Sequence, residues 1–499
     1  MPPTSRTTSL LHVTLLLVSI LLLPLANAAS LSKTDRPSYA QTCSRLQRAL
    51  SPQSKVHHPP TLLSYYQNAH HWFQSSSQRP TCILEAGSPD DVAVVLRIIG
   101  ETRTPFAVMS GGHASNRGFS STEGVHISLR RMDGVVVKGG GVVEVGFGAR
   151  WTDVFMELEG TGWNVVGGRV GGPGVGGLTL GGGYSWKTNQ YGLTIDTVKS
   201  FNLVLPNGTI TSASNITNSD LFFALKGGLN RFGIVTSAEF YAHRQPPKVY
   251  GGFIMYPSFS LPAVLNATME FYRTSKDPRT QVLTTTASSP IGGSTSIVLF
   301  FHDGPERPKA FDRFIDIPHA VSTMRAQRFY EFVESIPSEI VALINFRGAF
   351  ATMSTSALTP AFLDAVKNET DRFGRLMGSH HGVQINFDIE PFVDYGKFAT
   401  ESAFPHKSSP LPLNLYFAWA SQADDKFWYS EMRGSLDRLK VVAATDGIYD
   451  DSFTQYPNYA LFDATGEELY GKANAKRLRK IRDAVDPERV MDLTGGFVI

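Results

Sequence analysis

The chain has 499 residues, of which 42% are hydrophobic and 18% are charged. This length predicts more than one domain, and the composition is that of a globular protein rather than a disordered one. The formal net charge is +2 and no basic run stands out, so nothing in the sequence points to a nucleic acid partner.

The first 28 residues have the pattern of a secretory signal peptide. Arg6 supplies a positive start, an apolar run extends from Leu10 to Leu25, and Ala26-Asn27-Ala28 gives a cleavage site of small residues. A membrane anchor is the alternative, but the apolar run is short for a membrane span, which needs about 20 residues. We therefore expect a mature chain that begins near Ala29, is secreted and has no membrane anchor.

Two further features agree with export. Sequons for N-linked glycan occur at Asn207, Asn215, Asn266 and Asn368. The only two cysteines, Cys43 and Cys82, are expected to form a disulfide in an oxidising compartment, with two free buried thiols as the alternative. A metal site is not expected, because two cysteines without suitably spaced histidines do not make a zinc site.

Residues 29–75 are a lead-in, and short strands and helices alternate from residue 76 to residue 247. A Ser-Pro-Asp sequence at Ser88 caps the first helix of this region, and Asn207-Gly208 predicts a β-hairpin. The expected strands are Phe106–Met109, Val142–Val145, Phe201–Leu205 and Ile234–Tyr241. The expected helices are Val92–Ile99, Trp151–Leu158 and Asp220–Leu225.

Residues 248–465 predict a second domain of α+β type. Longer alternating strands are expected at Gln384–Glu390 and Leu413–Trp419, and helices at Thr359–Arg375 and Asp425–Lys440. Residues 466–499 form a closing segment with a helix and an extended tail.

Three glycine clusters are the strongest functional signal. They are Ser110-Gly111-Gly112-His113, the run from Gly167 to Gly183, and Gly227 to Gly233. Because glycine has no side chain, such loops let backbone N–H groups crowd around a phosphate. One cluster alone is as readily explained by turns, but three separated by strands could hold a large diphosphate cofactor.

The second cluster contains a G-x-G-x-x-G pattern from Gly172 to Gly177, with Asp196 downstream. A dinucleotide-binding Rossmann unit requires a helix directly after these glycines. Leu178-Thr179-Leu180 and three more glycines follow instead, and we expect no helix there. A Rossmann fold is therefore disfavoured.

In this order the motifs resemble those of FAD-linked oxidases of the vanillyl-alcohol oxidase type, and more narrowly the secreted fungal berberine-bridge-enzyme-like group. The resemblance is strongest from Pro80 to Thr236 and returns near the C-terminus at Tyr470-Gly471, Asn474 and Asp486-Pro487. The motifs that carry it are Ser110-Gly111-Gly112-His113, Val145-Gly146-Phe147-Gly148, Gly167-Gly168-Arg169, Gly176–Gly183, Tyr191–Asp196, Ala224–Gly228 and Phe232–Thr236.

The resemblance implies an α+β fold and an FAD cofactor. Its fold has a PCMH-type FAD-binding domain of two α/β subdomains, and a substrate domain with a large antiparallel sheet backed by helices. Ser110, Gly111 and Gly112 would wrap the diphosphate, and His113 would bond covalently to the 8α carbon of the flavin. Other expected cofactor residues are Gly174, Gly176, Gly177, Gly181, Gly183 and Asn474, with Gly233, Ile234 and Val235 near the adenosine.

Some members of this family add a second covalent link from a cysteine. The matching position is about Val170, so a single link is expected here.

On the substrate side, the strand Leu413–Trp419 places Asn414 and Tyr416 on one face. The resemblance places this strand over the flavin, with a catalytic carboxylate near Asn414. Asn cannot act as a base, so Tyr416 is the candidate base or orienting group, and a hydrogen-bonded tyrosine of a half-buried sheet is the alternative.

Two other polar patterns are assigned structural roles. The alternating polar face of Gln384–Glu390 is assigned to solvent rather than to the floor of a substrate cavity. His380 and His381 are adjacent and would point in opposite directions along a strand, so they are not expected to bind a metal together.

The expected function is an FAD-dependent oxidase that passes electrons from a small organic molecule to O2 and releases H2O2. The substrate would be a natural-product intermediate, an alcohol or a sugar. A dehydrogenase with another electron acceptor, or a flavin-carrying extracellular binding protein with little turnover, are the alternatives.

Overall fold

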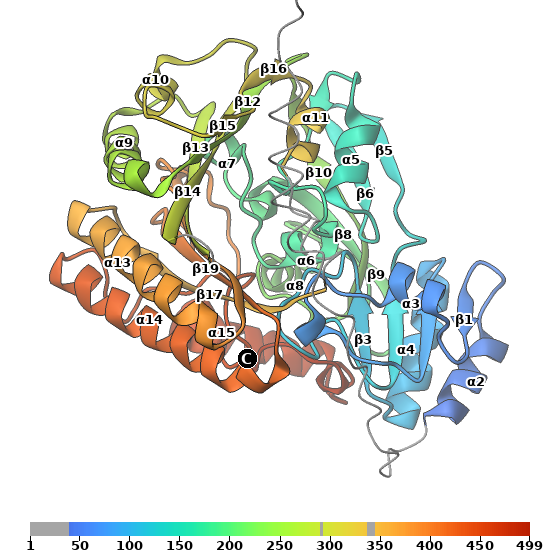
Figure 1. The fold of residues 1–499 in the computed structure, drawn as a ribbon. Helices are drawn as coiled ribbons and strands as arrows, with labels where there is room; N and C mark the ends of the chain where they lie inside the picture. Colours follow the sequence, from blue (N-terminus) through green and yellow to red (C-terminus); the bar gives the residue numbers. More distant parts are fainter. Residues whose placement is uncertain (1–38, 290–292, 337–344) are drawn as a thin grey trace, which may run out of the picture. The chain divides into compact units, whose positions relative to one another are not determined.

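The computed structural model describes residues 39–289, 293–336 and 345–499. The predicted signal peptide lies outside the described residues. Residues 39–247 contain two larger sheets with their helices and one two-stranded pair, and the residues that follow build one large sheet (Figure 1). Within the described residues no helix is both long enough and apolar enough to cross a membrane.

The first sheet has the strand order β1-β2-β4-β3, and β4 pairs in parallel with both β2 and β3. Ser88 accepts a hydrogen bond from the backbone of Asp91 and so caps α4 as predicted. The predicted Cys43–Cys82 disulfide is present and ties α2 to β2. The strands are β1 (Lys55–His57), β2 (Cys82–Glu85), β3 (Phe106–Met109) and β4 (Val125–Ser128), and the helices are α2 (Ala40–Ala49), α3 (Leu62–Asn68) and α4 (Pro89–Thr102).

The second sheet has the order β5-β6-β10-β8-β9 and is antiparallel. The predicted hairpin is confirmed, because Val204 of β8 pairs with Ile210 of β9 across Asn207-Gly208. The strands are β5 (Val135–Gly139), β6 (Val142–Gly146), β8 (Val198–Val204), β9 (Ile210–Ser214) and β10 (Ile234–Tyr241). The helices are α5 (Trp151–Leu158), α6 (Val175–Leu180), α7 (Thr188–Tyr191) and α8 (Ser219–Leu225), and a small pair joins β7 (Trp163–Asn164) to β11 (His243–Arg244).

Helix α6 contradicts the expectation that no helix follows the glycine run. It has six residues, begins after Gly174 and stops at Gly181, because Gly182 and Gly183 take positive φ angles of 124° and 87°. The Rossmann interpretation still fails, since the only strand just before these glycines is the two-residue antiparallel β7.

The third sheet has eight strands in the order β15-β12-β14-β13-β18-β19-β17, with β16 paired to β12. Its antiparallel pairing confirms the predicted large sheet, and Figure 1 shows α13 and α14 side by side along it. The strands are β12 (Val249–Tyr256), β13 (Thr280–Ser289), β14 (Gly293–His302), β15 (Val321–Ser322), β16 (Arg325–Gln327), β17 (Arg347–Thr355), β18 (Gly382–Ile389) and β19 (Leu411–Trp419). The helices are α9 (Leu261–Thr274), α10 (Asp312–Ile315), α11 (Phe329–Glu334), α13 (Pro360–Leu376) and α14 (Asp425–Thr445).

The apolar residues on one face of this sheet are covered by helices. Leu413, Leu415 and Phe417 of β19 pack with Phe373 of α13 and Trp428 of α14 in one buried cluster. The opposite face of β19, which carries Asn414 and Tyr416, lies toward the glycine loops.

The closing segment packs back onto the first part of the chain. Helix α15 (Gly466–Val485) contacts α8 and is bent at Gly471, which has a φ of 69°. The tail after α15 reaches Gly118 and Arg231, which are about 380 and 270 positions earlier in the chain.

Candidate active site

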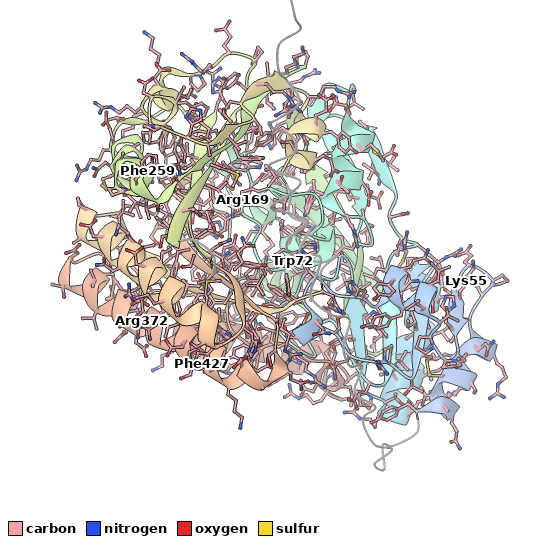
Figure 2. All side chains as sticks on the ribbon, in the orientation of Figure 1. Lys55, Trp72, Arg169, Phe259, Arg372 and Phe427 are labelled. Atoms are coloured by element: carbon pink, nitrogen blue, oxygen red, sulfur yellow. A yellow bond between two sulfur atoms is a disulfide. The ribbon has the colours of Figure 1, made fainter. Side chains whose placement is uncertain are left out.

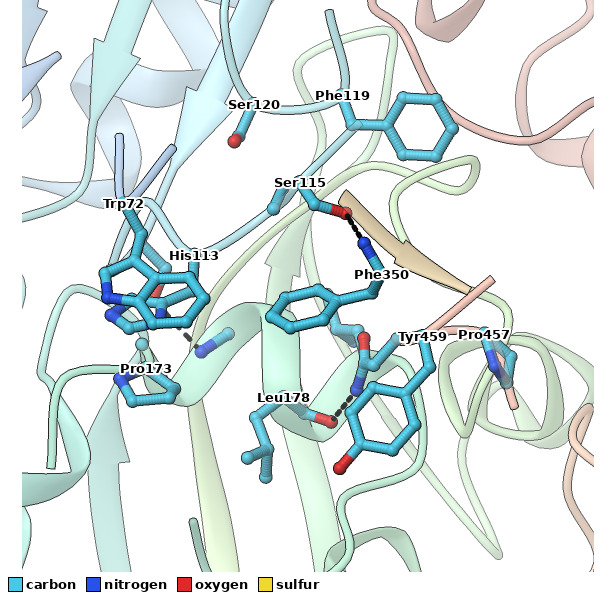
Figure 3. Close-up of a pocket in the computed structure, with 18 of the residues that line it drawn as sticks. Trp72, His113, Ser115, Phe119, Ser120, Pro173, Leu178, Phe350, Pro457 and Tyr459 are labelled. Carbon is cyan, nitrogen blue, oxygen red and sulfur yellow. Dashed lines mark hydrogen bonds between the residues drawn. The ribbon is translucent and has the colours of Figure 1, made fainter. Parts of the chain in front are cut away.

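A cavity of about 530 Å³ lies between the glycine loops and the polar face of the large sheet. Figure 3 shows part of its wall, with Trp72 and His113 on one side and Tyr459 on the other. Its lining combines loops 108–120, 169–180 and 229–235 with side chains from β13, β14, β17, β18 and β19. The predicted cofactor and substrate elements therefore meet at one place.

Two of the glycine loops cross in direct backbone contact. A Cβ atom on Gly111 would lie 2.1 Å from the backbone nitrogen of Gly174, and a Cβ on Gly174 would lie 2.1 Å from that of Gly111. Neither position can carry a side chain. Ser110 stabilises the contact between the two loops. Its hydroxyl donates a hydrogen bond to the Phe147 carbonyl at 2.6 Å and accepts one from the Gly176 N–H at 3.1 Å.

His113 lies at the turn that follows this crossing. Gly112 has a φ of 75°, and its carbonyl accepts a hydrogen bond from the Trp72 backbone at 2.9 Å. The Trp72 ring stacks on the His113 ring with centroids 5.1 Å apart and planes 17° apart (Figure 3). The lead-in segment thus supplies an aromatic neighbour for His113 that the sequence did not indicate.

The polar face of β18 lines the cavity, and its assignment to solvent is wrong. Gln384, Asn386 and Asp388 all belong to the lining. Alternation along the strand identified the shared face but not what covers it. The face is polar because it borders a cavity between two parts of the chain, and a polar pattern alone cannot distinguish that from bulk water.

Asp388 is the central polar group of this wall. Its carboxylate accepts hydrogen bonds from Thr285 at 2.6 Å and from the Asn414 amide at 2.9 Å. Burial raises the pKa of the Asp388 carboxyl above its usual range, although these two hydrogen bonds act in the opposite direction. A buried carboxyl of this kind at a cavity wall is a typical general acid or base.

Asn414 and Tyr416 lie where the sequence predicted, on one face of β19 and in the cavity lining. Among the described residues, the Asn414 side-chain oxygen and the Tyr416 hydroxyl are buried and have no hydrogen-bond partner. Burial and the nearby charge of Asp388 raise the pKa of Tyr416 above its usual range. Tyr416 is therefore held in its protonated form, as a hydrogen-bond donor toward whatever occupies the cavity.

Glu390, the last residue of the polar face, binds an arginine instead. Arg169 makes two hydrogen bonds to its carboxylate, at 2.5 and 3.1 Å, and a third to the Tyr459 hydroxyl at 2.7 Å. Arg169 lines the cavity and lies among the interior side chains in Figure 2. Its charge is balanced inside the wall, which leaves Asp388 as the acidic group that faces the cavity.

Most of the predicted cofactor residues line the cavity, and three do not. Those in the lining are Ser110, Gly111, Gly112, His113, Gly174, Gly176, Gly177, Gly233, Ile234 and Val235.

Gly181, Gly183 and Asn474 instead have packing roles. Side-chain atoms of Asn458 and Thr194 leave no room for a Cβ atom on Gly181 and Gly183, respectively. The Asn474 amide donates to the Ala403 carbonyl at 2.9 Å and so joins α15 to the loop before β19.

His380 and His381 lie away from the cavity. His380 stacks on Phe427, with ring centroids 3.5 Å apart, and His381 hydrogen-bonds Asp424 at 2.8 Å. Both histidines therefore stabilise the start of α14.

Comparison with known proteins identifies the family. A model described as an FAD binding domain matches residues 80–214, and one described as berberine and berberine like matches residues 455–493. The chain is 36% identical over 471 residues to the FAD-dependent monooxygenase macF of Penicillium terrestre, covering 90% of this chain and 87% of that protein. It is 30% identical over 447 residues to the FAD-dependent monooxygenase tpcD of Cochliobolus heterostrophus, covering 84% of each.

The chain belongs to the berberine-bridge-enzyme-like family of FAD-linked oxidoreductases. Solved structures agree in fold. The glucooligosaccharide oxidase of Acremonium strictum superimposes with a TM-score of 0.74 at 19% identity, covering 92% of this chain and 97% of that one. The 6-hydroxy-D-nicotine oxidase of Arthrobacter nicotinovorans gives 0.72 at 22% identity, covering 88% and 96%. The protein is thus an FAD-dependent enzyme with a PCMH-type flavin domain.

The residues of the cavity fit this cofactor. A Cβ atom on Gly177 would meet no other atom within 4 Å, so the backbone of α6 stands open to the cavity. The unpartnered oxygens of Asn414 and Tyr416 face the same space from the other side. A flavin between these two walls would contact the N–H groups of the glycine loops and the polar groups of β19.

Proposed function

We propose that the protein is a secreted oxidase that converts a C–OH group of a small organic molecule to a carbonyl. The observation that carries this proposal is the position of Asp388, a buried carboxyl with a raised pKa, beside Asn414 and Tyr416 on the cavity wall. Such an oxidation removes a hydride from carbon and a proton from oxygen, so the site requires a base near the hydroxyl.

Asp388 is the base that this geometry supports. Thr285 and Asn414 fix the orientation of its carboxylate, and in its ionised form it takes the hydroxyl proton of the substrate. Tyr416, held protonated, donates a hydrogen bond to the substrate oxygen and positions it. Bound FAD would supply the acceptor for the hydride that the substrate carbon loses, and reoxidation by O2 would take up the two electrons and two protons from the substrate as H2O2.

The same proposal includes a covalent link between His113 and the flavin. Stacking on Trp72 and the turn at Gly112 orient the imidazole at the cavity wall. A solved structure of the Acremonium strictum enzyme is titled for its 6-S-cysteinyl, 8α-N1-histidyl FAD. Val170 lines the cavity here without a nearby cysteine, which supports a single histidyl link.

Secretion is supported by surface features of the described chain. Asn207, Asn215, Asn266 and Asn368 are all exposed, so each sequon is accessible to glycan attachment. The Cys43–Cys82 disulfide fits an oxidising compartment. N-terminal sequencing of the secreted protein should find a start near Ala29; a chain that retains Met1 would contradict this part.

A second reading is a monooxygenase, because several relatives carry that name. Anaerobic mixing with a panel of alcohols, sugars and amines tests the proposal: a substrate should bleach the visible absorption of the flavin. Air should then restore the colour with one H2O2 per product. Recovery that needs another electron acceptor would indicate a dehydrogenase, and ¹⁸O from O2 in the product would indicate a monooxygenase. No bleaching across the panel would favour a binding protein.

A further inference from the structure

The C-terminal tail, residues 491–497, forms part of the cofactor cavity. Met491 and Phe497 line it beside Leu229, Asn230 and the strand start at Gly233–Val235. The last four residues of this tail, 494–497, lie beyond the matched berberine-like segment, which ends at residue 493. After the 3-10 turn at Met491–Leu493 the tail has no regular structure, so it needs specific contacts to act as a wall.

One buried side chain supplies most of those contacts. Arg231 is 7% exposed and does not itself line the cavity. Its guanidinium donates hydrogen bonds at 2.7 to 3.3 Å to four backbone carbonyls of the tail, those of Met491, Thr494, Gly496 and Phe497. An arginine spreads five N–H donors over three nitrogens in a fixed plane, whereas the three donors of a lysine share one nitrogen and cannot reach acceptors that are spread this widely.

Neighbouring contacts close the tail against the glycine loops. A Cβ atom on Gly495 would lie 2.2 Å from the Gly118 carbonyl oxygen, so the two backbones touch. Asn230 donates to the Gly495 carbonyl at 2.9 Å. Phe497 packs edge-on against Phe119, another lining residue, with ring centroids 4.8 Å apart.

We propose that Arg231 is a positioning residue for FAD, which acts by holding the C-terminal tail as the wall of the cofactor cavity. The carbonyls that it binds come from residues on both sides of the turn at Gly496, so losing the guanidinium releases the whole tail rather than one contact. Met491 and Phe497 are then part of the cofactor site.

The test measures FAD affinity in a His113→Ala background, so that no covalent link can mask dissociation. FAD is titrated into the apoprotein and followed by its fluorescence, and near-UV circular dichroism checks folding. Arg231→Lys should weaken FAD binding by about tenfold or more, since several charged hydrogen bonds are lost. The matched control is Arg103→Lys. Arg103 also binds two carbonyls of the closing segment, those of Glu488 and Arg489, but these do not line the cavity.

Arg103→Lys should leave FAD affinity within threefold of the parent. An equal loss of FAD affinity in both variants would mean that Arg231 only stabilises the C-terminal segment in general, which would contradict the proposal. Unchanged FAD affinity in Arg231→Lys would also overturn it. If Arg231→Lys does not fold, Phe497→Ala decides, because it removes a lining side chain and keeps every acceptor of Arg231. Weaker FAD binding in that variant supports the tail as a wall, and unchanged binding refutes it.

Discussion

Replacing Asp388 with Asn should slow flavin reduction and should also change how the stability of the protein depends on pH. The substitution keeps the shape of the side chain and removes the base. General base catalysis contributes about 10²–10⁴-fold, so the rate of flavin reduction by substrate should fall by at least about 10²-fold, or about 2.7 kcal/mol of activation free energy. The same side chain is buried with a raised pKa, so its ionised form is disfavoured by the fold.

The sign of the stability effect follows from that raised pKa. A carboxyl whose pKa is higher in the folded state stabilises the fold fully only below its unfolded pKa, and that contribution is lost as pH rises through the folded pKa. Each unit of raised pKa corresponds to about 1.4 kcal/mol at neutral pH. The stability of Asp388→Asn relative to the wild type should therefore increase from pH 4 to pH 7, because only the wild type has to ionise a buried carboxyl. The hydrogen bond that the variant loses costs it about 1 kcal/mol at both pH values.

Two assays check this prediction. Anaerobic stopped-flow measures flavin reduction from pH 4 to pH 8, and urea unfolding measures stability at pH 4 and pH 7. In the wild type the reduction rate should rise with pH as Asp388 ionises, with a midpoint above the ordinary carboxyl pKa, and the variant should lack this rise. Asp371→Asn is the control, since Asp371 pairs with Lys367 on α13 and does not line the cavity. A reduction rate within threefold of wild type in Asp388→Asn would refute the role of Asp388 as the base.

Three other predictions follow from the cavity and its surroundings. Tyr416→Phe should lower the rate of flavin reduction by about tenfold, the value of one hydrogen bond, with no change in its pH dependence; a loss of about 10²-fold or more would make Tyr416 the base. Acid-denatured wild-type protein should retain yellow flavin on the peptide that contains His113, whereas His113→Ala should release it; free FAD from the wild type would disprove the covalent link. Burial lowers the pKa of His126 to about 3. Protonation of this histidine in the unfolded chain should therefore reduce the free energy of unfolding by about 1.4 kcal/mol for each pH unit below about 6.5. Urea unfolding of His126→Leu should show a shallower pH dependence than that of the wild type, and an equal slope would contradict the prediction.

Local patterns in the sequence predicted the elements well where the determining contacts are themselves local. Helix α4 follows from Ser88 and Pro89, which cap and start it, and the β8–β9 hairpin follows from Asn207-Gly208. The glycine clusters were also informative. A backbone that must touch another backbone, as at Gly111 and Gly174, requires glycine whatever the partner is.

Prediction failed where the partner comes from far away in the chain. The sequence showed a polar face on β18 but not that loops some 200 residues earlier cover it. The sequence also did not show that side-chain atoms of Asn458 and Thr194 lie where a Cβ atom on Gly181 and Gly183 would lie. Trp72 carries no motif, and its contact with His113 exists only because the lead-in folds over the turn at Gly112.

The charged residues from position 169 to position 196 show most clearly why local sequence could not predict the site, because their partners lie far away in the chain. Each is buried and meets an opposite charge or an ionisable partner from the later part of the chain, in the pairs Arg169–Glu390, Lys187–Asp303 and Asp196–His406. Breaking a buried pair by removing one partner costs about 3–5 kcal/mol, although an apolar replacement of both partners is often neutral.

These pairs therefore contribute little to net stability, and their main effect is to favour one packing of the large sheet on the glycine loops over other packings. A shifted packing of the large sheet on the glycine loops would leave up to three buried charges without partners, at a cost comparable to the whole stability of a typical domain. His406 in addition lies in the loop that leads into β19, and its ring nitrogens bond Asp196 at 2.8 Å and the Phe404 carbonyl at 2.9 Å. Both contacts fix the orientation of the His406 ring in this loop. These contacts thus hold the loop that leads into the strand that presents Asn414 and Tyr416 to the cavity, and they tie this loop to the domain that carries the glycine clusters.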